Sequence, residues 1–96
     1  MILIILINHS SLRITEIVGL KGLITLKLGH NLLTSVSVEL CKLSSLKSLS
    51  LERNKIALIP MEVGGLISLT ELDISHNKLK NLPSTLVFHS SSFYNI

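Results

Sequence analysis

The chain has 96 residues, enough for one domain and near the lower limit at which a single hydrophobic core is self-sufficient. It is 47% hydrophobic but only 3% aromatic, so Leu, Ile and Val must build the core. The net charge of +3 is too small to indicate binding to nucleic acid or to an anionic membrane. A single cysteine, Cys41, excludes an internal disulfide framework and is compatible with a reducing compartment.

The first predicted element is the apolar run MILIILI, which ends at Asn8. This run lacks a basic segment before it and a small-residue cleavage pattern after it, so it does not resemble a signal peptide. It is also much shorter than the roughly 20 apolar residues of a transmembrane helix. Its β-branched residues therefore favour a strand. The triplet Asn8-His9-Ser10 matches a glycosylation sequon, a pattern that also arises by chance.

The chain then repeats itself at an interval of 23 residues, counted from Leu23, Leu46 and Leu69. In each copy, apolar residues alternate over a short segment and then recur at fixed distances on the far side of an Asn. A fixed period of this length predicts a stacked solenoid rather than a closed globule. The expected boundaries, with all four repeats inside residues 1–87, are 2–22, 23–45, 46–68 and 69–87.

The two ends of the chain fit the repeat less well. The first copy is two residues shorter and is expected to turn Ile2, Ile5 and Ile7 toward the interior. Residues 88–96 lose the pattern and are expected to form a Ser-rich, poorly ordered tail. An apolar first strand and a Ser-rich end leave both ends of the stack uncapped, so we also expect self-association through these ends.

One Asn follows the strand segment in three of the copies, at Asn31, Asn54 and Asn77. Asn is a poor strand residue and is costly to bury without hydrogen-bond partners. It does, however, tolerate turn conformations, and its short side chain carries both a donor and an acceptor. We therefore expect a structural ladder of Asn side chains that bind backbone groups left unpaired by the turns.

The segments LKSLSLERNKIALIPMEVGGLISL and LTELDISHNKLKNLP follow the pattern LxxLxLxxNxLxxLPxxIxxLxxL. This pattern resembles the leucine-rich repeat family, typical 23-residue subtype, over about residues 2–87. The spacer EVGGLISL is most similar to intracellular Ras-group members, such as Ras-suppressor and Ras-scaffold proteins. Departures from the pattern are Ser37 in place of Pro, Ser10 in place of Asn, and His89 in place of Leu. The resemblance implies an α/β horseshoe segment, with a parallel sheet on the concave side and irregular or 3₁₀ segments on the convex side.

Strands placed by the repeat would present one row of side chains to solvent on the concave side. Along the stack, this row changes from apolar, through basic, to acidic residues. Such a surface is expected to dock another protein, with the apolar patch as an anchor and the charges setting orientation. The expected partner-binding residues are Ile4, Leu6, Lys27, His30, Lys47, Ser50, Glu52, Arg53, Glu71, Asp73 and His76.

Enzymatic and metal-binding functions find little support in the residue pattern. His9, His30 and His76 form a column with Arg53, but no Cys or carboxylate joins them, so we expect no metal site. Cys41 is expected at an outward or half-covered position without a His in register, which excludes a catalytic thiol. The chain also lacks a Gly-rich phosphate loop and the basic, aromatic surface of a nucleic-acid binder. We expect no catalytic residue, no cofactor, no nucleic-acid partner and no membrane span.

The resulting hypothesis is a protein–protein interaction module that binds a partner through its concave face. The family resemblance implies a cytoplasmic signalling setting, with a Ras-like small GTPase or a signalling complex as the partner. Two alternatives stay open. The chain could be a structural segment of a longer leucine-rich repeat protein with no binding site of its own, or an extracellular recognition module.

Overall fold

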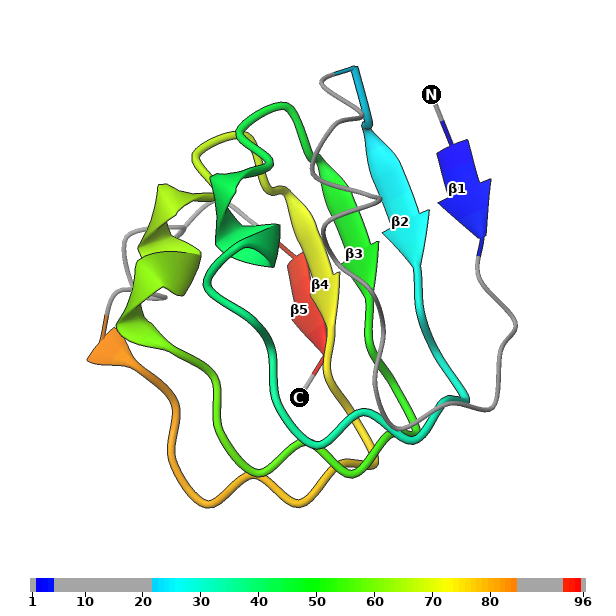
Figure 1. Ribbon diagram of the computed structural model, residues 1–96, viewed down its shortest axis with the longest axis vertical. Helices are drawn as coiled ribbons and strands as arrows, with labels where there is room; N and C mark the ends of the chain where they lie inside the picture. The colour runs from blue at the N-terminus through cyan, green and yellow to red at the C-terminus, as the bar shows by residue number, and fades with distance from the viewer. Residues whose placement is uncertain (1, 5–21, 85–92, 96) are drawn as a thin grey trace.

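The computed structural model describes residues 2–4, 22–84 and 93–95. These residues form one sheet of parallel strands whose spatial order follows the chain, and the strands run side by side in Figure 1. A parallel sheet in sequence order means that each coil stacks on the coil before it, so the predicted solenoid is confirmed. The strands are β1 (Ile2–Ile4), β2 (Thr25–Lys27), β3 (Ser48–Ser50), β4 (Glu71–Asp73) and β5 (Phe93–Asn95).

Within residues 22–84, two short 3₁₀ helices lie on the side away from the sheet (Figure 1). They are η1 (Leu40–Lys42) and η2 (Met61–Gly65), and they contact each other. Gly65 helps this contact because a Cβ at that position would lie 3.1 Å from the Cys41 carbonyl oxygen, closer than most side chains allow. The expected 3₁₀ side of the solenoid is therefore present.

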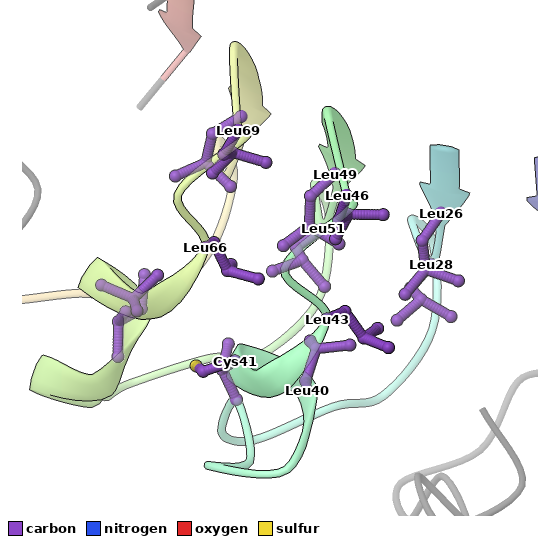
Figure 2. Close-up of a cluster of buried hydrophobic side chains, with 14 of the residues drawn as sticks. Leu26, Leu28, Leu40, Cys41, Leu43, Leu46, Leu49, Leu51, Leu66 and Leu69 are labelled. Carbon is purple, nitrogen blue, oxygen red and sulfur yellow. The ribbon is translucent and has the colours of Figure 1, made fainter. Parts of the chain in front are cut away.

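The hydrophobic core fills the space between the sheet and the 3₁₀ helices, and Leu side chains from both sides meet there in Figure 2. The central residue of each of three strands, Leu26, Leu49 and Leu72, points inward and is buried. All of the interior positions predicted between residues 23 and 74 are likewise buried. Replacing one of these aliphatic residues by Ala is expected to cost about 2–5 kcal/mol, because a cavity remains.

The Asn side chains at the turns join neighbouring coils. The Asn54 side-chain nitrogen donates to the carbonyl oxygen of Leu51 in its own coil (2.9 Å) and of Leu28 in the preceding coil (3.0 Å). Its side-chain oxygen accepts from the backbone nitrogen of Leu33 at 3.1 Å. Asn77 repeats this pattern one coil later, with Ile56 donating to its oxygen at 2.9 Å. The side chains thus satisfy backbone groups that the turns expose to the interior.

The structure corrects the expected alignment of the first copy. Leu3 pairs with the inward-facing Leu26, and Ile4 pairs with Lys27, so β1 and β2 keep the full 23-residue separation. The prediction of a copy shortened by two residues, with Ile2 rather than Leu3 at an interior position, was therefore wrong at this strand. Every residue of MILIILI is apolar, so no polar residue in the run distinguishes one alignment from the other.

The C-terminal end also differs from the prediction at residues 93–95. These residues form β5, which pairs with β4 through Glu71 and Phe93, Leu72 and Tyr94, and Asp73 and Asn95. A poorly ordered tail was expected here because the Leu pattern is lost, but parallel pairing needs only backbone groups. The other residues of the predicted tail lie outside the described part of the chain.

Candidate functional site

Alternation along the strands builds a solvent-facing surface on the sheet. Because the middle residue of each strand points into the core, its two neighbours point to the opposite side. The strands pair in register, so equivalent residues stand directly beside one another. We call this surface the sheet face, which comprises Thr25 and Lys27 on β2, Ser48 and Ser50 on β3, and Glu71 and Asp73 on β4.

The two acidic residues of the sheet face receive hydrogen bonds from neutral donors. The Ser48 hydroxyl donates to the Glu71 carboxylate at 3.4 Å. The Asp73 carboxylate accepts from both the backbone nitrogen of Ser75 (3.0 Å) and its hydroxyl (2.6 Å). Within residues 22–84, the ion pair that the structure shows, Glu39 with Lys42, lies on the 3₁₀ side. Neither acid of the sheet face therefore has its charge neutralised by a cation of residues 22–84.

Five further predicted residues lie next to the strands rather than within them. Lys47 directly precedes β3 and is exposed. His30, Arg53 and His76 occupy one equivalent position in successive turns, just beyond the strand ends, and all three have positive φ angles of 56–59°. Since the three residues share one backbone conformation at positions 23 residues apart, their side chains leave successive coils in one row beside the sheet face. This conformation costs roughly 1–2 kcal/mol in a residue other than Gly.

Glu52, the fifth, occupies space that its neighbour leaves open. A Cβ on Gly29 would overlap the Glu52 carboxylate, so this carboxylate lies against Gly29 of the preceding coil. One of its oxygens, Oε2, is buried without a hydrogen-bond partner in the described structure. Sequence reasoning placed Glu52 on the surface but missed the role of Gly29. A signal was available, since Gly29 stands where the next two coils have Glu52 and Ser75.

The predicted apolar anchor is described only in part. Ile4 lies beside Lys27 in the strand register, which is a position on the sheet face, while Leu6 lies outside the described residues. The polar residues of the sheet face differ in exposure. Ser50 and Asp73 are half-buried, whereas Lys27 and Glu71 are exposed. The structure thus brings Lys27, Ser50, Glu71 and Asp73 together on one face, with Lys47 and Glu52 at its margins.

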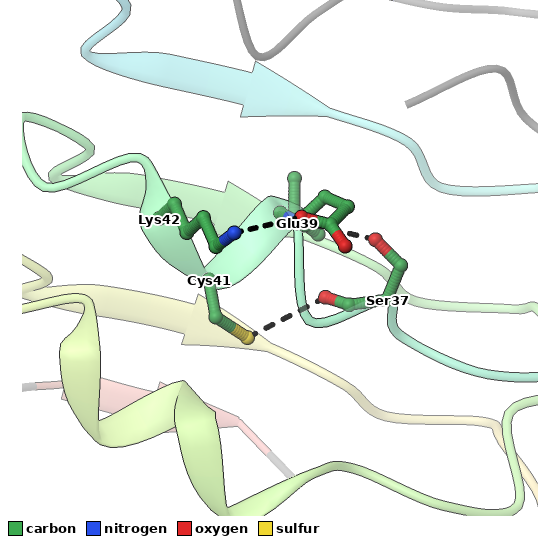
Figure 3. A network of polar contacts seen from close by, with 5 residues as sticks. Ser37, Glu39, Cys41 and Lys42 are labelled. Atoms are coloured by element: carbon green, nitrogen blue, oxygen red, sulfur yellow. Dashed lines mark hydrogen bonds and ion pairs between the residues drawn. The ribbon is translucent and has the colours of Figure 1, made fainter. Parts of the chain in front are cut away.

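Ser37, which replaces the Pro of the repeat pattern, forms part of a small polar network with η1 (Figure 3). Its hydroxyl oxygen accepts from the backbone nitrogen of Leu40 at 3.2 Å. Its carbonyl oxygen accepts from the Cys41 thiol, with sulfur and oxygen 3.6 Å apart. Glu39 and Lys42 form an ion pair at 3.1 Å across the same turn, which ties both ends of η1 together.

Cys41 itself is buried, contrary to the expected outward or half-covered position. Its side chain is 3% exposed because it packs into the core beside Leu40, where the 3₁₀ turn directs it inward (Figure 2). Burial and, to a smaller extent, the nearby Glu62 carboxylate together raise the pKa of the Cys41 thiol to about 11. A thiol that stays protonated at neutral pH is a poor nucleophile.

Among residues 22–84 there is no group of three or more His, Cys, Asp or Glu side chains that could hold a metal ion. Nor does the described part of the chain contain a helix that is long and apolar enough to cross a membrane. The sheet face carries charged side chains spaced along three strands. Such a surface can bind another macromolecule, and within residues 22–84 it brings together no convergent reacting groups.

Comparison with known proteins adds the family context. A family model described as leucine rich repeat matches residues 8–56, and a second leucine rich repeat model matches residues 68–89. Among solved structures, a leucine-rich repeat protein of Leptospira interrogans is similar, with a TM-score of 0.79 and 39% sequence identity. This similarity covers 83% of the chain but only 20% of the Leptospira protein. No curated protein sequence matches the chain.

Proposed function

Because this chain belongs to the leucine-rich repeat family, we propose that it is an interaction module that docks another protein on its sheet face. Domains of this family generally mediate protein–protein interactions and are typically not enzymes. The observation that supports the sheet face as the docking surface is its set of charged and hydroxyl side chains. They stand in register on three strands, and no ion pair joins them within residues 22–84.

We further propose a cytoplasmic signalling role, with a Ras-like small GTPase or a signalling complex as the partner. The support is the similarity of the spacer EVGGLISL to Ras-group members of the family. The protonated, buried Cys41 is compatible with a reducing compartment. A glycan on Asn8, a residue outside the described part of the chain, would instead favour the extracellular alternative.

Site-specific photo-crosslinking tests the choice of face. A photoreactive amino acid at Ser50, in the middle strand of the sheet face, is expected to crosslink bound protein in a cell lysate. The same amino acid at Met61, which is 63% exposed on the 3₁₀ side, serves as the control and is expected to give no product. Products at Met61 alone would move the docking surface to the 3₁₀ side.

Charge reversal provides an independent test of the same proposal. The double variant Lys47→Glu with Arg53→Glu alters two exposed residues at the margin of the sheet face and is expected to abolish the Ser50 crosslink. Glu39→Lys with Glu62→Lys changes two exposed residues on the 3₁₀ side and is expected to leave that crosslink unchanged. The same two double variants can also be tested for binding to a purified Ras-like GTPase that is loaded with a GTP analogue.

A second candidate function is a structural segment within a longer solenoid. The observation that favours it is that the similarity covers only 20% of the Leptospira protein, which is much longer than this chain. A structural segment binds no partner through its sheet face. Absence of crosslinks at both Ser50 and Met61, in a chain shown to be folded, would support this candidate over docking.

A further inference from the structure

The sheet face separates its positive charge from its negative charges by a whole neutral strand. Lys27 on β2 has Ser50 beside it on β3 and Ile4 beside it on β1. Asp73 on β4 has Ser50 on one side and Asn95 of β5 on the other. Neither residue thus has an opposite charge at the paired position on a neighbouring strand.

Glu71 is placed in the same way. Its paired residues are Ser48 on β3 and Phe93 on β5, neither of which carries a charge. Adjacent strands lie about 4.8 Å apart, so β2 and β4 are roughly 10 Å apart across β3. Cross-strand ion pairs form between paired or diagonal neighbours. Glu52 is an acidic diagonal neighbour of Lys27, but its carboxylate lies against Gly29, and residues 22–84 show no ion pair between Lys27 and Glu52. The charges of Lys27, Glu71 and Asp73 are therefore available for a partner.

The middle strand also limits what shape of partner can approach. Ser48 and Ser50 have the smallest polar side chains of the sheet face, and both are only partly exposed. Ser50 lies between the longer, charged side chains of Lys27 and Asp73. A low, hydroxyl-bearing centre flanked by charges can accept a backbone lying close to the sheet. Glu52 adds an unpartnered buried carboxylate oxygen at the margin of this surface, on the coil that contains β3.

From this arrangement, and resting on the proposed docking function, we infer that the sheet face binds an extended segment of another protein that crosses the strands. This segment carries an acidic side chain over Lys27 and a basic side chain over Glu71 and Asp73. In an extended segment of polyproline II conformation, three residues complete a turn with a rise of about 3.1 Å each, so side chains three residues apart lie on the same side, roughly 9 Å apart. The recognised element is therefore an acidic and a basic residue separated by two others.

Synthetic peptides with blocked termini test this inference directly against the full chain. Three twelve-residue peptides of Gly, Ser and Thr carry, at the same central spacing, Glu and Lys, Glu and Glu, or Lys and Lys. Fluorescence anisotropy at low salt is expected to show that the Glu and Lys peptide binds roughly fivefold more tightly than the other two. Moving Glu and Lys to adjacent positions should remove this advantage, because the spacing no longer matches.

A single charge reversal should change the preference rather than merely weaken binding. In Lys27→Glu the face becomes uniformly acidic, so the Lys and Lys peptide is expected to become the tightest of the three. Lys55→Glu makes the same change in net charge at an exposed residue outside the sheet face, and the original order should persist. A gain of affinity for one peptide cannot result from a loss of folding.

The remaining outcomes separate this inference from the proposed function. Ser50→Trp places a large side chain in the centre of the face and is expected to block all peptide binding. Equal binding of the three peptides that Ser50→Trp abolishes would overturn the charge pattern while leaving the sheet face as a docking surface. Binding that Ser50→Trp leaves intact would overturn both. Failure of every peptide to bind would overturn the extended segment, and the Ser50 crosslink would then decide the docking proposal by itself.

Discussion

The coils that contain η1 and η2 show how differently two copies of one repeat can be built. Both bury the same set of interior positions, with Leu40 and Leu43 in one coil matched by Val63 and Leu66 in the other. Their routes into the 3₁₀ turn differ, however. Ser37 uses its hydroxyl to accept the Leu40 backbone nitrogen, whereas η2 follows a Pro and has no side-chain cap.

This difference indicates which parts of a coil are strictly required. Interior positions must fill a shared core, so each coil has to match its neighbours there. The turn needs only a residue that starts a 3₁₀ segment, and either a fixed Pro φ angle or a hydroxyl acceptor provides this. The substitution of Ser for Pro at position 37 is thus compatible with the repeat because a hydrogen bond replaces a rigid ring.

Among polar residues, the largest expected effect comes from Asn54, which joins these two coils. Asn54→Ala should lower the free energy of unfolding by about 1–3 kcal/mol, because the Leu33 backbone nitrogen loses its acceptor. The carbonyl oxygens of Leu28 and Leu51 also lose one donor each, although Asn31 and Asn77 still donate to them. Asn77→Ala should cost less, since Asn77 is only half-buried and water can replace part of its bonding. Chemical denaturation measures both, with the exposed Asn81→Ala as control. Equal midpoints for the three variants would contradict the interpretation of the ladder.

A smaller effect is expected from Ser37, where the two coils differ. Ser37→Ala should destabilise the chain by roughly 1 kcal/mol, because the Leu40 backbone nitrogen loses its acceptor. Ser37→Thr keeps the hydroxyl and should retain most of the stability. Thermal melts of both variants beside the exposed Ser44→Ala would check this. Destabilisation by Ser37→Thr as large as that by Ser37→Ala would argue against a cap.

The last effect concerns Cys41; it is absent at neutral pH and becomes visible only at alkaline pH. The folded chain holds the pKa of this thiol at about 11, above its ordinary value, so the unfolded chain releases the proton first. Stability from this group is therefore complete below the ordinary thiol pKa of about 8.5 and is lost as pH rises toward 11. Cys41→Ala should show a shallower fall in denaturation midpoint over this range. A fall of unchanged steepness would assign the pH dependence to other groups.

Much of the fold was predictable because the repeat pattern encodes burial directly. Leu26 and Leu49 alternate with polar residues, so their inward direction could be deduced from the strand period. MILIILI has no alternation of apolar and polar residues, so the sequence does not show which of its side chains point inward, and the register of β1 could not be assigned correctly. β5 was missed because Phe93, Tyr94 and Asn95 share no side-chain pattern with the earlier strands.

The candidate site was less predictable, since several of its features depend on contacts between coils. Lys27, Glu71 and Asp73 could be assigned to a surface from alternation alone. The position of the Glu52 carboxylate against Gly29 depends on how a side chain from one coil packs on the backbone of the preceding coil. The burial of Cys41 likewise follows from the direction of a 3₁₀ turn, which the repeat period does not specify.

The constant register has a consequence for how a gene of this kind can change length. β1 with β2, β2 with β3, and β3 with β4 each pair residues 23 positions apart, whereas β4 and β5 pair residues 22 apart. Loss or duplication of residues 46–68 would again place Leu beside Leu and Asn beside Asn, so the core and the Asn ladder would be preserved. A deletion of five or ten residues would instead align core positions with surface ones. Insertions and deletions are thus expected to survive mainly in steps of one coil, and between β4 and β5, where the separation of paired residues already differs.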